Sequence, residues 1–424
     1  MPAFPDPPET LNPQSPALSP YAAFESRGFR FFLVGNFLST IGGQMLSVGV
    51  GWEIYRRTGS ALALGLIGLT GALPVIALAI PAGHLADRFS RRSILMTSQL
   101  IAAGASVGLA YVSFTVADVR WIFFLLLLAG IARTFGWAAR GAFMVNLVPQ
   151  AHFNNAVTWN SSTFETASVT GPAIAGLLLV HHPYWLIYAI DAASSVAFFL
   201  MLIPTPSSWT RTGIRPAGFE GLFDGLRFVF RTKIVLATIT LDLFAVLFGG
   251  ATALLPIFAD RILHVGPAGL GWLRAAPSMG AICMALTLAH GRPMRRPGVA
   301  LLCAVTGFGV VTIVFGLSRW FPLSMAMLFL SGAFDNVSVV VRHTLVQILT
   351  PDAMRGRVSA VNNVFIGSSN EIGAFESGVT AAWFGVIVSV VGGGVLTIIT
   401  VVMVAVMWRE VVRLGAFSTL RPEG

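Results

Sequence analysis

The chain contains 424 residues, of which 55% are hydrophobic and 11% are charged, and its mean hydropathy is +0.78. Soluble globular proteins contain about a quarter charged residues, so this composition excludes a water-soluble enzyme and predicts a polytopic protein of the lipid bilayer. The net charge of +9 does not indicate a nucleic-acid partner, because the basic residues cluster beside apolar segments, as they do in the loops of membrane proteins.

The first segment, 1–26, is rich in Pro and Ser and lacks the basic start and apolar run of a signal peptide. We expect it to be a disordered cytoplasmic tail. Twelve apolar segments follow, each long enough to cross a bilayer as a helix, which takes about 20 residues. They lie at 29–54, 61–82, 93–116, 121–147, 155–180, 184–203, 234–258, 268–289, 298–317, 321–349, 358–384 and 386–408. All must be helices, because an open strand edge in lipid leaves backbone groups unsatisfied.

The longest polar stretch inside the chain lies between Pro204 and Lys233 and separates six spans from six. We therefore predict an all-α polytopic fold of 12 transmembrane helices arranged as two six-helix bundles. The predicted parts after the tail are an N-terminal bundle at 27–204, a cytoplasmic linker at 205–232, a C-terminal bundle at 233–412 and a cytoplasmic tail at 413–424.

The distribution of basic residues predicts the orientation. With both termini inside the cell, 18 Lys and Arg residues fall in the inner segments, 5 fall in the outer loops and 4 lie within spans. This asymmetry satisfies the positive-inside rule. The sequence therefore predicts a multi-pass protein of the cell membrane with both termini cytoplasmic.

The two halves of the chain share a pattern of charged, small and helix-ending residues. At an offset of 202 the aligned pairs are Gly130/Gly332, Arg133/Asp335, Arg140/Arg342 and Pro149/Pro351. At an offset of 206 the aligned pairs are Asn36/Asp242, Leu64/Leu270 and Gly65/Gly271. Such repeats are typical of transporters built from two related bundles, so we expect the bundles to be pseudo-symmetric.

Charged residues within the predicted spans are the candidates for a proton and substrate pathway. A charge at the bilayer centre costs about 2.5–3.5 kcal/mol on insertion scales, so such residues normally face a partner or a water-filled cavity. The candidates are Asp335, Glu371, Arg342, Arg133, Asp242, Glu376 and Arg140. Among the acids, Asp335 and Glu371 come first and Asp242 third, with the arginines Arg342 and Arg133 as charge partners. The alternative interpretation is structural, with buried Arg–carboxylate pairs that tie helices together.

Other kinds of chemistry find little support in the sequence. Lys233 is the only lysine, so the chain contains no GxxxxGK phosphate loop and ATP-driven pumping is not expected. Cys283 and Cys303 lie in apolar stretches without His or Asp nearby, so we expect no metal and no cofactor. A catalytic cluster is also missing, since the adjacent pair His181-His182 has no carboxylate close by in the sequence.

A charged loop between the second and third spans carries the most specific motif. It reads Gly83-His84-Leu85-Ala86-Asp87-Arg88-Phe89-Ser90-Arg91-Arg92 and resembles the Gly-x-x-x-Asp-Arg-x-Gly-Arg-Arg loop of the major facilitator superfamily, with Ser90 in place of the usual Gly. The resemblance implies the major facilitator fold and a conformational latch that holds the outward-facing state and breaks on opening inward. The latch residues would be Gly83, Asp87, Arg88, Arg91 and Arg92. The alternative is an ordinary basic loop.

Two further resemblances point to a branch of that superfamily. Span five carries Gly171-Pro172-Ala173-Ile174-Ala175-Gly176, which is similar to the Gly-Pro element of the superfamily's antiporters and predicts a bend with close helix packing. Other segments resemble the drug:proton antiporter-3 branch, which includes enterobactin exporters. These segments are Ala139-Arg140-Gly141-Ala142, Leu147-Val148-Pro149, Asn155-Ala156, Pro351 to Val358 and Asn370-Glu371-Ile372-Gly373.

The resemblance extends from about Phe29 to Arg409 and implies a secondary active transporter. It implies export of an amphipathic drug or siderophore in exchange for protons, by alternating access of the two bundles, and we expect a monomer. One alternative is import or facilitated diffusion of a sugar, amino acid or metal. A more remote alternative is a polytopic membrane enzyme acting on lipid.

Overall fold

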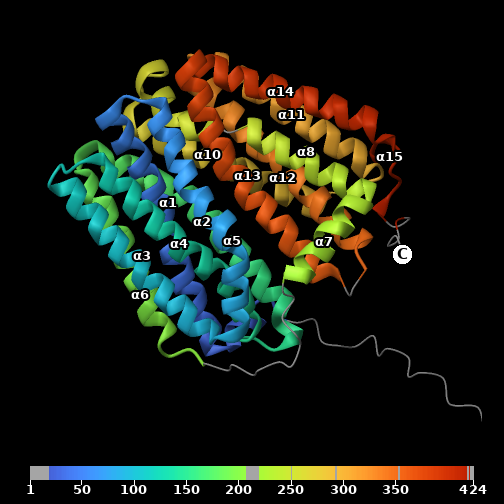
Figure 1. Cartoon of the computed structure of the whole chain (residues 1–424), viewed down its shortest axis with the longest axis horizontal. Helices are drawn as coiled ribbons and strands as arrows, with labels where there is room; N and C mark the ends of the chain where they lie inside the picture. The colour runs from blue at the N-terminus through green and yellow to red at the C-terminus, as the bar shows by residue number, and fades with distance from the viewer. Residues whose placement is uncertain are drawn as a thin grey trace, which may run out of the picture.

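The computed structural model describes residues 19–206, 219–249, 251–291, 294–351, 354–417 and 420. Most of the predicted N-terminal tail and the first part of the predicted linker lie outside these ranges. Within them the chain is helical and contains no strand, which confirms the all-α fold (Figure 1).

The described helices follow the order of the predicted spans. The first half contains α1 (Arg27–Thr58), α2 (Ala61–Arg88), α3 (Arg91–Phe114), α4 (Val119–Val145), α5 (Phe153–His181) and α6 (Tyr184–Leu202). The second half contains α8 (Lys233–Phe248), α10 (Gly266–His290), α11 (Pro297–Leu317), α12 (Phe321–Leu349), α13 (Arg355–Phe384) and α14 (Val386–Met407). The short helices are α7 (Phe219–Arg231), α9 (Leu255–Ile257), α15 (Arg409–Val412) and 3-10 turns at Ala22–Glu25, Gln150–His152 and Ala251–Leu254.

Serine side chains set where the first three helices begin. Ser26, Ser60 and Ser90 precede α1, α2 and α3, and each side chain accepts a hydrogen bond from the backbone N–H three residues ahead. This satisfies one of the unpaired donors of the first turn. Ser90 therefore has a structural role at the position where the superfamily motif usually has Gly. Gly59, at φ 62°, ends α1 in the left-handed conformation that glycine adopts without strain.

Eleven segments of the described chain are long and apolar enough to cross a membrane. Helix α13 is long enough, at 30 residues, but polar residues such as Asn362, Asn370 and Glu371 lower its hydropathy. It packs against α2, α8 and α14, so its polar side chains have protein neighbours as well as lipid. This is the usual place for polar groups within a membrane protein.

The seventh span differs from the single helix predicted at 234–258. Helix α8 ends at Phe248, and a 3-10 turn, the short α9 and a π-helical segment at Phe258–Ile262 continue the crossing. Gly249 is a poor helix former and Pro256 has no backbone N–H to donate, so both weaken the helical hydrogen-bond ladder here. The irregular stretch ends the seventh span beside the first half.

The two halves meet along two pairs of helices, α2 against α13 and α5 against α10. Figure 1 shows the first half, blue to green, beside the second half, yellow to red. We call the end of the molecule that holds the turn at 59–60 the joined end. We call the opposite end, which holds the turn at 89–90, the split end.

The apolar clusters differ between these two ends. At the joined end one cluster contains Trp52 and Leu179 of the first half together with Phe258 and Leu273 of the second. At the split end each half has a cluster of its own. The first includes Phe29, Phe143 and Leu202, and the second includes Val235, Leu345 and Val404. Because buried apolar area is the main stabilising term in packing, apolar contacts hold the halves together chiefly at the joined end.

Candidate transport site

The face of α4 that carries Arg133 is turned toward the second half. The Arg133 guanidinium donates a hydrogen bond to Glu371 Oε1 of α13 at 2.9 Å. One turn further, the ring of Trp137 would lie 3.5 Å from a Cβ placed on Gly367 of α13. The Arg133 side chain is nevertheless 62% exposed, and Trp137 is 55% exposed. Both side chains therefore contact the second half while more than half of each stays exposed.

The repeat places an equivalent surface on α12. At the offset of 202, Arg133 corresponds to Asp335 and Val145 to Gln347, and both of these α12 residues are exposed. His343, between them on the same face, is exposed too. Asp335 has no ion-pair partner among the described residues. The two halves therefore offer charges of opposite sign at symmetry-related positions.

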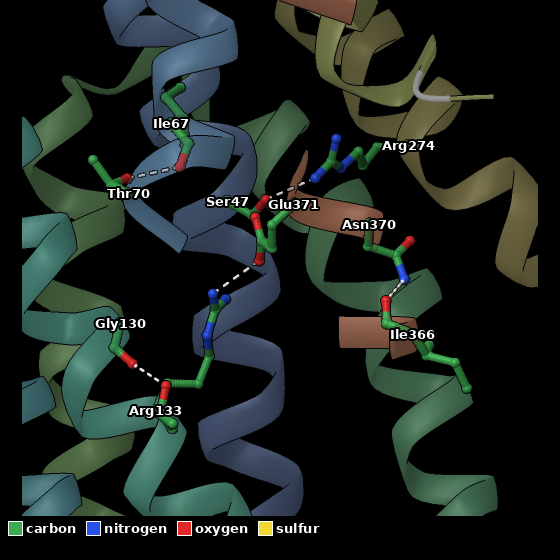
Figure 2. Close-up of polar contacts among 10 residues, drawn as sticks. Ser47, Ile67, Thr70, Gly130, Arg133, Arg274, Ile366, Asn370 and Glu371 are labelled. Atoms are coloured by element: carbon green, nitrogen blue, oxygen red, sulfur yellow. Dashed lines mark hydrogen bonds and ion pairs between the residues drawn. The ribbon is translucent and has the colours of Figure 1, made fainter. Parts of the chain in front are cut away.

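Glu371 lies between two arginines (Figure 2). On one side is Arg133, and on the other is Arg274 of α10. The Arg274 guanidinium donates to Ser47 Oγ of α1 at 2.8 Å and to the Thr252 carbonyl at 2.9 Å. Ser47 and Arg133 belong to the first half, and Arg274 and Glu371 belong to the second. We call these four residues the bridging cluster, because two hydrogen bonds in it join the halves.

Glycines of α2 leave room for the carboxylate of the bridging cluster. A Cβ on Gly71 would lie 2.6 Å from Glu371 Oε2, and a Cβ on Gly68 would lie 2.6 Å from the Glu371 carbonyl oxygen. Any larger residue at either position would displace Glu371 or separate the helices. The close approach of α2 to α13 therefore depends on these two glycines.

A second intramembrane ion pair lies inside the second half. Arg342 of α12 pairs with Asp242 of α8, and the two side chains are 2% and 9% exposed. Arg342 thus pairs with the third-ranked acid and not with Asp335. Asp242 and Asp335 both line a cavity of about 10 Å³, which is room for about one water. The cavity therefore borders both the exposed acid and the carboxylate of the buried pair.

The corresponding positions of the first half contain different chemistry. Asn36, which aligns with Asp242, donates from its side-chain amide to Asn160 Oδ1 at 3.0 Å. The guanidinium of Arg140, which aligns with Arg342, lies 5.6 Å from the ring centroid of Phe198. Arg140 has no carboxylate partner within the described part of the chain. The repeat therefore conserves the arginine position but not the ion pair.

Glu376 lies outside the bridging cluster. It follows Glu371 by five positions on α13, so the two side chains point to different faces of the helix. It is half-buried, and no described residue forms an ion pair with it. The structure does not bring this candidate together with the other pathway residues.

The arginines of the motif between α2 and α3 contact the first half. Arg91 donates to the Ala142 carbonyl near the end of α4 at 3.0 Å. Arg92 donates to the Leu202 carbonyl at the end of α6 at 2.9 Å. The last carbonyls of a helix carry partial negative charge, which favours a cation there. These contacts tie the α2–α3 turn to its own bundle.

The other motif residues give less information. Arg88 is exposed, and a Cβ on Gly83 would meet no atom within 4 Å. The side chain of Asp87 lies outside the described residues. The latch function therefore stays a prediction.

Two glycine crossings hold the helix pairs together at the joined end. A Cβ on Gly65 of α2 would lie 2.9 Å from Gly378 Cα of α13, and a Cβ on Gly176 of α5 would lie 2.7 Å from Gly271 Cα of α10. Gly65 aligns with Gly271 at the offset of 206, and Gly176 aligns with Gly378 at the offset of 202. The pseudo-symmetry that relates the two halves therefore superposes the α2–α13 crossing on the α10–α5 crossing.

The Gly-Pro element contributes to one of these crossings. Gly171 faces α1, where a Cβ would lie 3.0 Å from the Ile41 carbonyl oxygen, and Gly176 meets Gly271 on α10. Helix α5 continues through Pro172 from Phe153 to His181. The element therefore permits close packing on two sides, and the expected bend stays a prediction.

Three residues of this region were not selected from the sequence. Arg274 had a usable signal, since it is a charge within a span, and Trp137 lies one turn from Arg133. Asp260 had none. Its carboxylate accepts from Tyr55 Oη at 3.2 Å and pairs with Arg56 at 3.4 Å across the halves at the joined end.

A family model described as transmembrane secretion effector, within the major facilitator superfamily, matches residues 18–416. The chain belongs to the transmembrane secretion effector family. Membership confirms the resemblance drawn from the motifs and identifies a transporter, which excludes the alternative of a membrane enzyme.

Curated relatives of this family member include exporters. The chain is 27% identical over 348 residues to the enterobactin exporter EntS of Shigella boydii serotype 18 (strain CDC 3083-94 / BS512), which covers 82% of the chain and 83% of the relative. The enterobactin exporter EntS of Escherichia coli O1:K1 / APEC matches with the same identity and coverage.

Solved transporter structures share the fold. A bacterial homologue of the human lysosomal transporter Spinster, in an inward-facing and unoccupied conformation, matches with a TM-score of 0.71 at 16% identity, over 92% of this chain and 97% of that one. The peptide transporter POT in complex with sulfate matches with a TM-score of 0.73 at 14% identity, over 92% and 96%. These matches confirm the major facilitator fold.

Proposed function

We propose that this secretion effector exports an amphipathic, siderophore-like small molecule across the cell membrane in exchange for protons. The similarity to enterobactin exporters supports the direction and the class of cargo. The bundles predicted at 27–204 and 233–412 would act as a monomer and rock about a site between them, as secondary transporters of this architecture do.

The separation of the split end fits a state that receives cargo from the cytoplasm. If both termini are cytoplasmic, as the basic residues predict, the split end faces the cytoplasm and the joined end faces outward. The contacts of Arg91 and Arg92 with their own bundle agree with this state, because the latch is expected to break on opening inward. The exposed surfaces of α4 and α12 would then receive the cargo.

The observation that carries the coupling proposal is the ion pair between Arg133 and Glu371, which joins the halves beside the exposed surface. An empty transporter would be locked at the joined end by this pair. A proton on Glu371, or a polar group of the cargo bound to Arg133, would each release the lock. Because both act on one pair, proton and cargo alternate, and exchange follows.

Flux measurements on the full chain in reconstituted vesicles test this proposal. In Glu371→Gln we expect downhill movement of a siderophore-like probe to persist and accumulation against its gradient, driven by a pH gradient, to be lost. The control Glu410→Gln alters an acid outside the spans that pairs with Lys233 at 3.6 Å, and it should keep gradient-driven accumulation. Full gradient-driven accumulation by Glu371→Gln would contradict the coupling role.

A further inference from the structure

Helix α7, which follows the predicted linker between the two halves, packs part of its apolar surface against the second half and leaves another part exposed. Leu226 and Val229 pack into the cluster of the second half at the split end, and Val229 is 2% exposed. Phe223 and Phe230 remain 64% and 60% exposed. These two phenylalanines are seven residues apart, which is two helical turns, so they share one face.

Basic residues border this aromatic face. Arg227 lies one turn after Phe223, and Arg231 lies one turn after Arg227, and both arginines are exposed. A helix turns by about 100° per residue, so a residue four positions later lies about 40° further around it. Arg227 and then Arg231 therefore lie progressively further from the two phenylalanines and closer to Asp224. Among the residues from Phe223 to Arg231, whose side chains the structure describes, the exposed arc of α7 therefore runs from aromatic through basic to acidic.

The acidic edge of the arc fixes the rotation of α7. Asp224 Oδ2 accepts a hydrogen bond from the Arg357 guanidinium of α13 at 2.9 Å. Next to it, a Cβ on Gly225 would lie 2.9 Å from the Arg357 carbonyl oxygen. Turning the phenylalanines toward the bundle would break the ion pair and this close backbone contact.

We propose that α7 is a membrane-surface helix that binds anionic phospholipid. Phe223 and Phe230 enter the interfacial layer of the bilayer, and Arg227 and Arg231 bind the lipid phosphates. Aromatic residues beside arginines on one face of an amphipathic helix are typical of such binding, and anionic headgroups complement the two positive charges. Only Thr232 separates α7 from α8, a membrane span, so α7 lies next to the end of that span (Figure 1).

Spin-label accessibility in reconstituted vesicles tests this position. In a background with Cys283→Ala and Cys303→Ala, which removes both cysteines of the chain, a label is placed at Phe230→Cys. Collisions with oxygen, which concentrates in lipid, are compared with collisions with a water-soluble nickel chelate. The lipid control is Val402→Cys on α14, 58% exposed, and the water control is Arg120→Cys, whose side chain is 93% exposed.

We expect the oxygen-to-nickel ratio at position 230 to lie near that of the lipid control. Adding phosphatidylglycerol to phosphatidylcholine vesicles should raise this ratio by about twofold through attraction of the basic residues. The double variant Arg227→Gln/Arg231→Gln should lose this rise while keeping the fold, because the ion pair at Asp224 is untouched. A ratio equal to that of the water control in both kinds of vesicle would overturn the proposal. Insensitivity to phosphatidylglycerol would overturn the anionic-lipid assignment.

Discussion

The joined end and the split end of the molecule are stabilised in different ways. At the joined end, one apolar cluster and two glycine crossings connect the halves, and the bridging cluster lies deeper, near the middle of α4 and α13. At the split end each half has a separate apolar cluster. The difference indicates that the contacts between the halves are concentrated along two helix pairs, and that the apolar contacts among them gather at the joined end. A transporter that changes state needs only to exchange this limited set of contacts.

Breaking the buried pair of Arg342 and Asp242 should have the largest effect, because this pair stabilises the second half from within. In Arg342→Met the Asp242 carboxylate stays buried without its partner, which costs about 3–5 kcal/mol. We expect a large fall in the Tm of the purified protein. The double variant Arg342→Met/Asp242→Asn should regain most of the loss, because no buried charge is left unpaired.

The repeat supplies a matched control for this variant. Arg140→Met changes the equivalent arginine of the first half, which lies over Phe198 and has no carboxylate partner among the described residues. Its effect on Tm should be clearly smaller. Equal losses of Tm in Arg140→Met and Arg342→Met would show that the ion pair does not stabilise the second half.

The glycine crossings test the joined end itself. In Gly65→Leu the new side chain meets the backbone of Gly378, and overpacking of this kind costs about 1–3 kcal/mol. We expect the joined end to open, so that maleimide labels Ala381→Cys, a position otherwise 5% exposed, roughly tenfold faster or more. Gly104→Leu, where a Cβ meets nothing within 4 Å, should leave the rate unchanged.

The polar contact at the rim of the joined end should have the smallest effect. Asp260→Asn removes an ion pair with Arg56 whose side chains are 53% and 29% exposed, and exposed pairs contribute about 0–1 kcal/mol. We expect labelling of Ala381→Cys to accelerate by less than about fivefold. Asp118→Asn weakens an exposed pair within the first half and should have no effect. If Asp260→Asn accelerated labelling as much as Gly65→Leu does, the Arg56–Asp260 ion pair, and not the glycine crossing, would be the main contact that closes the joined end.

The sequence alone was enough to predict the order of the membrane-spanning segments and the repeat that relates the two halves. Apolar length predicted twelve crossings, and the offset of 202 predicted that Arg133 and Asp335 occupy equivalent positions. The sequence also indicated Arg133 as a charge partner for the leading acids Asp335 and Glu371. It did not indicate which of the two acids, because Arg133 and Glu371 are 238 positions apart and their contact depends on how the two halves pack. The interrupted seventh span had visible signals in Gly249 and Pro256. The sequence alone could not show whether Pro256 interrupts the seventh helix or lies within a continuous one.

The central claim is that the pair of Arg133 and Glu371 locks the joined end. Distances between paired spin labels across the halves test it directly, with one pair at the joined end, at Leu62 and Trp383, and one at the split end, at Phe89 and Gln347. Introducing Glu371→Gln should lengthen the distance at the joined end and shorten the distance at the split end. Unchanged distances, or a change of the same sign at both ends, would contradict the account.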